Sequence, residues 1–176
     1  MEEILSILEN FKRDFHEYAL ADTDVLKFQE GVAASCRMNY CGMYNRTWMC
    51  PPAVGNWQEL EKEFRKYRRF FVFTTKHDIE DSFDIEGMGR GKDEHKLVQD
   101  RVQEALRGLP CRILGAGGCG ICKTCTYPDA PCRFPDKAVP SMEACGINVV
   151  ELSRDVGIHY INGQNTVTYF SMVFFD

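Results

Sequence analysis

The sequence predicts an α/β fold, with α+β as the alternative class, in a single domain spanning residues 1–176. Segments with helical periodicity are interleaved with short segments rich in β-branched and aromatic residues. No linker, internal repeat or low-complexity tract divides the chain, and 176 residues suffice for one hydrophobic core. We therefore expect a small sheet of roughly three or four strands, with helices packed on it and two cysteine-rich loops.

The first half of the chain is expected to contain two helices and one strand. Apolar residues recur every three or four positions over about residues 2–18, which predicts an amphipathic helix. Residues 19–55 show no such period, and we expect irregular structure there. Asn56 can cap a second helix. The β-branched and aromatic residues at 69–75 then predict a buried strand.

Glycines and prolines divide the second half of the chain. A polar, glycine-rich loop is expected at 78–91, followed by a helix over about 92–107 with Leu97, Val98, Val102 and Leu106 facing inward. A short strand at 112–115 leads into a glycine-rich loop with four cysteines. Ser141 can cap a helix that ends near Val156, and residues 166–175 predict the last strand.

Composition excludes several classes of protein. The net charge of −5 predicts no basic face, so nucleic acid is not an expected partner. No apolar run approaches the roughly 20 residues that span a bilayer, so we expect no membrane partner. The acidic start Met1-Glu2-Glu3 is unlike a secretory signal, which predicts a cytoplasmic protein. Nine cysteines, an odd number, then indicate metal ligation in preference to a disulfide scaffold.

Four of the cysteines fall within fourteen residues, as Cys119-Gly-Ile-Cys122-Lys-Thr-Cys125 and then Cys132. Two consecutive Cys-x-x-Cys steps place three thiols on one turn, as in bacterial ferredoxins, although the fourth interval is longer here. Structural zinc sites more often pair two separated Cys-x-x-Cys elements. This spacing favours a [4Fe–4S] cluster, with zinc as the alternative.

A second candidate site consists of Cys36, Cys41 and Cys50, the last followed by two prolines. Polar residues interleave with these cysteines, which favours a second cluster over burial in the core, although the core remains the alternative. Three thiolates would leave one iron open to a substrate. A fourth ligand could instead come from Cys111, Cys145, a histidine or a carboxylate, although each of these two cysteines alone is better explained as a core residue.

These two cysteine sets, together with Pro140-Ser-Met-Glu-Ala-Cys-Gly146, resemble the uncharacterised family of predicted metal-binding proteins that is known as domain of unknown function 2284. The resemblance covers about residues 30–157. It implies a cytoplasmic iron–sulfur protein and no established reaction. By motif, it carries over the following ligands: Cys36, Cys41, Cys50, Cys119, Cys122, Cys125 and Cys132.

Three functions are consistent with these features. The first is electron transfer or redox chemistry by one or two clusters, with a redox protein as partner. The second is an enzyme whose open-iron, three-cysteine cluster binds and activates a small molecule. The third is a structural zinc module. Residues 87–92 form either a flexible connector or an anion site, in which Arg90, Lys92 and His95 would bind a phosphate or an acidic substrate.

Overall fold

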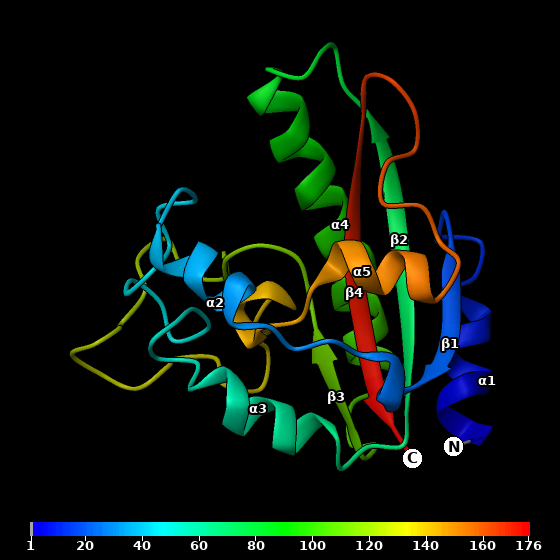
Figure 1. Ribbon diagram of the computed structural model, residues 1–176, viewed down its shortest axis with the longest axis horizontal. Helices are drawn as coiled ribbons and strands as arrows, with labels where there is room; N and C mark the ends of the chain where they lie inside the picture. The colour runs from blue at the N-terminus through cyan, green and yellow to red at the C-terminus, as the bar shows by residue number, and fades with distance from the viewer. Residues whose placement is uncertain (1) are drawn as a thin grey trace.

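The computed structural model describes residues 2–176, which contain one four-stranded sheet with helices on both faces (Figure 1). The strands are β1 (Tyr18–Asp22), β2 (Arg69–Asp78), β3 (Cys111–Leu114) and β4 (Thr166–Phe175). The α-helices are α1 (Glu2–Asn10), α2 (Glu30–Arg37), α3 (Trp57–Phe64), α4 (Ile85–Ala105) and α5 (Val149–Asp155). Two 3₁₀ turns, η1 (Thr23–Val25) and η2 (Glu143–Cys145), complete the set. The predicted fold class is confirmed: a small sheet, packed helices and two cysteine-rich loops.

All neighbouring strands of the sheet are antiparallel, in the order β1-β2-β4-β3. The long strands β2 and β4 form the centre, and their ladder runs from Arg69 opposite Phe175 to Asp78 opposite Thr166. Strand β1 pairs with the outer edge of β2, and the short β3 pairs with β4. The cysteine loop that follows β3 therefore leaves the sheet at an edge strand.

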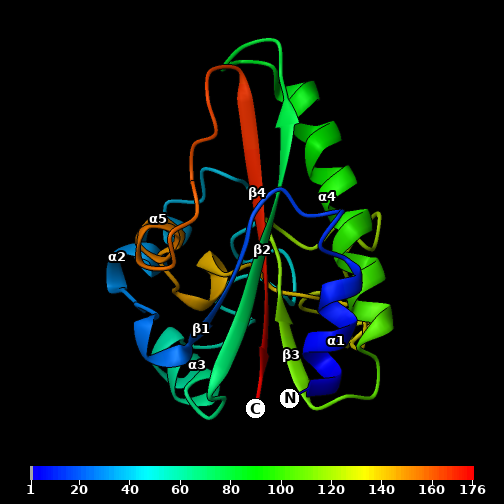
Figure 2. The same ribbon diagram turned by 90° about the vertical axis from the view of Figure 1, so that its right-hand side faces the viewer.

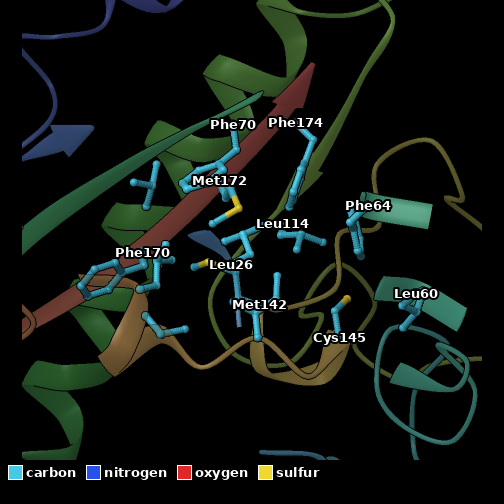
Figure 3. Close-up of a cluster of buried hydrophobic side chains, with 14 of the residues drawn as sticks. Leu26, Leu60, Phe64, Phe70, Leu114, Met142, Cys145, Phe170, Met172 and Phe174 are labelled. Carbon is cyan, nitrogen blue, oxygen red and sulfur yellow. The ribbon is translucent and has the colours of Figure 1, made fainter. Parts of the chain in front are cut away.

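Side chains alternate between the two faces of the central strands, and both faces are buried. Figure 2 shows α1 and α4 on one face, and α2, α3 and α5 on the other. The core beneath α1 and α4 includes Ile4, Leu8, Phe73 and Val102. Figure 3 shows the opposite core, whose labelled members are Leu26, Leu60, Phe64, Phe70, Leu114, Met142, Cys145, Phe170, Met172 and Phe174.

The predicted first helix is too long. Helix α1 ends at Asn10, and Tyr18, at the end of the predicted range, begins β1 and is 43% exposed. The region expected to be irregular therefore contains β1, and it also contains α2. Strand β1 forms because β2 offers it a pairing edge, with Tyr18 opposite Phe73.

Two further boundaries differ from the prediction. The glycine-rich segment at 78–91 is partly helical, because α4 begins at Ile85 and the Asp84 side chain accepts a hydrogen bond from the Gly87 N–H. Leu97, expected to face inward on this helix, is 65% exposed. The single helix expected over 141–156 is divided into η2 and α5 at Gly146, which has a φ of 85°. No helix within residues 2–176 has the length and apolar character needed to cross a bilayer.

Candidate metal centre

The four clustered cysteines line one small pocket in the loop between β3 and η2. Cys119, Cys122, Cys125 and Cys132 are each partly exposed, and they share this pocket of about 20 Å³ with the following residues: Thr47, Trp48, Met49, Ile121, Thr126, Arg133, Phe134 and Ala138. The spacing of the cysteines predicted that these side chains would face a common space. The metal ion or cluster that they bind there stays a prediction.

Hydrogen bonds within the loop explain how Cys132 returns to the other three cysteines. The Thr126 hydroxyl donates to the Pro131 carbonyl over 2.8 Å, and the Ala130 N–H donates to the Thr126 carbonyl over 3.0 Å. The Arg133 guanidinium donates to the Thr124 carbonyl over 2.9 Å. The six-residue interval between Cys125 and Cys132 is therefore a closed turn that returns the chain to the pocket.

The loop that follows α2 and carries Cys41 and Cys50 packs directly on this turn. The Trp48 indole N–H donates to the Ala130 carbonyl over 3.0 Å, and the Tyr127 hydroxyl donates to the Asn45 side-chain oxygen over 2.8 Å. The rings of Trp48 and Tyr127 meet edge to face, with centroids 5.0 Å apart. Figure 1 shows both loops together beyond β3, on the side of α2. The two cysteine sets thus belong to one lobe of the molecule.

Cys36, Cys41 and Cys50 lie near one another in this lobe. Cys36 is in the last turn of α2, and its thiol lies 3.8 Å from the Glu143 carbonyl oxygen. Burial raises the pKa of the Cys36 thiol, and Cys41, Glu143 and Cys50 raise it further. Glu143 is exposed to solvent, yet protein surrounds its carboxyl group on the other sides, and this desolvation raises its pKa.

Cys50 connects the two cysteine sets. It is buried, and burial is the main cause that raises the pKa of its thiol. Cys41 of its own set and Cys119 of the other set raise this pKa as well, whereas the Thr47 hydroxyl and the Lys92 ammonium lower it. Cys50 is therefore within electrostatic range of both sets and of one cation.

Thr47 fits a site that holds charged sulfur. Its side chain is 5% exposed, and its hydroxyl oxygen makes no hydrogen bond of normal geometry within the described chain. The hydroxyl nevertheless lies close enough to the Cys50 thiol to lower its pKa. A buried hydroxyl without a partner carries a cost, which a thiolate acceptor at Cys50 would remove. Sequence analysis missed Thr47, because nothing in its flanking residues marks it.

The two cysteines that were better explained as core residues than as a fourth ligand do lie in or beside the cores. Cys145 lies in the core with no exposed surface, and burial raises its pKa to about 12. Cys111 is on β3 at the margin of the other core. For the part of the chain described here, no three cysteine, histidine or carboxylate side chains stand close enough together to hold one metal ion. The seven-cysteine ligand set therefore stays a prediction.

Comparison with known proteins gives one match. No curated protein and no solved structure matches this chain. A family model described as a predicted metal-binding protein, DUF2284, matches residues 19–175, a span that includes all nine cysteines. The description names metal binding without naming the metal, and it agrees with the resemblance found from the cysteine motifs. The chain therefore belongs to the DUF2284 family of predicted metal-binding proteins.

Proposed function

We propose that this protein binds a [4Fe–4S] cluster through Cys119, Cys122, Cys125 and Cys132, and that it serves in electron transfer or related redox chemistry. The observation that supports this most is the shared pocket, which four thiols from one short loop line together. Thiolates are the ligands that such clusters use, and consecutive Cys-x-x-Cys steps are typical of them. A bound cluster would accept and release single electrons.

The surrounding residues suit such a cluster. Trp48, Met49 and Phe134 line the pocket and limit the access of water, and the dielectric around a cluster affects its potential. Arg133 also lines the pocket, so that a cation lies beside a centre whose four thiolates make it anionic. The glycine-rich stretch before Cys119 allows its backbone to approach sulfur closely.

A second cluster at Cys36, Cys41 and Cys50 would support an enzyme as the alternative function. The observation that favours it is the proximity of these three thiols: after burial, Cys41 and Cys50 raise the pKa of the Cys36 thiol, and Cys41 and Cys119 raise that of Cys50. Three protein ligands would leave one iron open to a small molecule. A structural zinc module is the third candidate, because thiolates also bind zinc.

We further propose a single metal-binding domain over residues 1–176 that works in the cytoplasm, where thiols are kept reduced. Its partner would be a redox protein in the first function and a small-molecule substrate in the second. The metal sites would then form on the same sheet edge, because both cysteine loops pack there.

The test is oxygen-free purification followed by iron and sulfide analysis of three variants. Cys125→Ala should lose about four irons per chain, and Cys50→Ala should lose a second cluster if one is present. Cys111→Ala is the matched control, because Cys111 lies on β3 and outside the four-cysteine pocket. Full iron content in Cys125→Ala would refute the ligand assignment, and zinc without iron in the parent protein would favour the structural module.

A further inference from the structure

A second cavity lies beside the proposed cluster, between α4 and the glycine-rich segment 115–121. Its volume is about 90 Å³, and its lining includes Lys92, His95, Gln99 and Cys119. A single water needs roughly 10–15 Å³ by the same measure, so this cavity has room for several waters or one small ligand. Cys119 and Ile121 line both this cavity and the four-cysteine pocket, so the two cavities adjoin each other.

Gln99 presents an unpartnered donor to this cavity. The residue is 5% exposed, and its Oε1 accepts a hydrogen bond from the Ser171 hydroxyl over 3.0 Å. The hydrogen bonds of the described residues include none from its Nε2. The amide lies against Gly115 at the cavity wall with Oε1 as the nearer atom, and Nε2 lies 3.4 Å from the point where a Cβ on Gly115 would stand. A Cβ at position 115 would lie 2.1 Å from Gln99 Oε1, so only glycine leaves the amide in this place.

A buried chain of hydrogen bonds sets the orientation of the Gln99 amide. Ser171 has one hydroxyl proton and donates it to Gln99, so His95 must donate to Ser171 through Nε2, over 2.8 Å. His95 Nδ1 then accepts from the Thr75 hydroxyl over 2.8 Å, and Thr75 accepts from His77. Each donor fixes the next, and the Gln99 amide at the end of the chain lines the cavity with N–H groups that have no partner among the described residues.

The other end of the chain is anchored by the Glu94 carboxylate. His77 Nδ1 lies 3.0 Å from a Glu94 carboxylate oxygen, and His77 Nε2 lies 2.8 Å from the Thr75 hydroxyl. His95 itself is 1% exposed, and burial lowers its pKa to about 4, so it stays neutral and passes on the orientation. A buried polar network of this size is costly unless every member has a partner. The one donor left over is the Gln99 Nε2 group in the cavity.

Lys92 supplies a positive charge in the same place. It is half-buried, and no carboxylate of the described chain lies within ion-pair distance of its ammonium group. Its Nζ lies 3.1 Å from the point where a Cβ on Gly117 would stand, directly on the cysteine loop. Lys96, also in the lining, is already paired with Asp100. The only lining carboxylate, Asp93, is exposed at the rim.

The backbone of the loop adds further donors. The N–H groups of Ala116, Gly117, Gly118 and Gly120 make no backbone hydrogen bond in the part of the chain that the structure covers. The residues that carry these peptide N–H groups, the Gln99 amide and the Lys92 ammonium group thus line one small space. An anion or another strong acceptor is the ligand that satisfies such unpaired donors.

We propose that this cavity binds a small anion, a carboxylate or oxyanion of about four to six non-hydrogen atoms. Lys92 supplies the charge, Gln99 Nε2 donates a directed hydrogen bond, and the loop N–H groups complete the contact. Ser171 is a positioning residue, because it acts only through Gln99. The site does not depend on the identity of the metal. If the proposed cluster is present, the anion lies beside its ligand Cys119.

The test is isothermal titration calorimetry of the oxygen-free, full-length protein with acetate, nitrate and sulfate at constant ionic strength. We expect saturable binding of at least one of these anions and none of methylammonium. Lys92→Met and Gln99→Leu should each weaken the affinity roughly 10-fold or more, since each removes a hydrogen bond to a charged ligand. Ser171→Ala should weaken it less, because the Gln99 amide remains but is free to turn.

The controls separate a local effect from misfolding and from the metal. Lys66→Met removes an exposed lysine elsewhere and should leave anion affinity unchanged. Iron content is measured on every sample, and one titration uses protein from which the metal has been removed. Anion binding that persists in that sample supports this site even if the cluster proposal fails. Absence of binding by all three anions, or equal affinity in the parent, Lys92→Met and Gln99→Leu proteins, would overturn the proposal.

Discussion

Replacing Thr47 by valine should have opposite effects on stability in the metal-free and metal-loaded protein. The Thr47 side chain is 5% exposed, and its hydroxyl has no hydrogen-bond partner of normal geometry within the described residues. A buried, unsatisfied hydroxyl costs about 1–3 kcal/mol, and valine has nearly the same shape without the hydroxyl. In the metal-free protein, Thr47→Val should therefore raise the free energy of unfolding by about 1 kcal/mol or more.

Metal binding changes the partner of this hydroxyl. If Cys50 is a ligand, its sulfur becomes a thiolate, and the Thr47 hydroxyl can then donate to a charged acceptor nearby. A hydrogen bond to a charged group contributes about 1.5–3 kcal/mol. Valine cannot make this bond. In the metal-loaded protein, Thr47→Val should therefore lower the free energy of unfolding by about 1.5 kcal/mol or more.

Urea denaturation without oxygen, followed by circular dichroism, measures both effects. Thr23→Val is the matched control, because Thr23 is also buried but its hydroxyl donates to the Tyr67 carbonyl over 2.7 Å. This control should destabilise the protein by about 1 kcal/mol with and without metal. The same loss of stability for Thr47→Val in both metal states would refute the role assigned to Thr47 and Cys50.

Three further predictions concern the framework. Gly118→Ala places a Cβ 2.8 Å from Met43 Cε and 2.9 Å from its Cγ, so it should cost about 1–3 kcal/mol of unfolding free energy, and Met43→Ala should relieve this loss in a double-mutant cycle. Burial, and to a smaller extent the neighbouring His77, lower the pKa of His95 from its ordinary 6.5 to about 4. Below pH 6.5 the unfolded chain therefore binds a proton that the folded protein does not. The free energy of unfolding should fall by about 3 kcal/mol from pH 6.5 to 4. His95→Gln should flatten this part of the measured stability profile, and an unchanged profile would contradict the assignment. Asn56→Ala removes the cap that accepts from the Gln58 N–H over 2.8 Å, and a thermal unfolding scan should show a loss of about 1 kcal/mol, which Asn56→Asp should largely avoid.

Local sequence patterns correctly predicted the helices and strands that neighbouring residues in the sequence determine. Helix α3 begins after Asn56, as its capping side chain indicated, and β4 has the predicted bounds because its β-branched and aromatic residues run without interruption. Strand β1 could not be predicted in this way. It is short and partly exposed, and it forms because β2 offers it an edge. The start of α4 was missed because its glycines suggested a loop, whereas Gly91 lets the helix approach His77.

The site shows the same division. The short spacing from Cys119 to Cys132 was enough to predict that these residues face one pocket. The placement of Thr47 against that pocket, and of Gln99 against Gly115, depends on contacts between distant parts of the chain. Ser171 is 72 residues from Gln99, so no local pattern could indicate their hydrogen bond. The sequence therefore predicts the candidate sulfur ligands, and only the fold shows their polar surroundings.

X-ray absorption at the iron and zinc edges of protein purified without oxygen tests the central proposal most directly. The proposal predicts iron surrounded by sulfur, with short-range iron–iron scattering and about four irons for each cluster. A protein that contains zinc with four sulfur neighbours, and no iron, would contradict it.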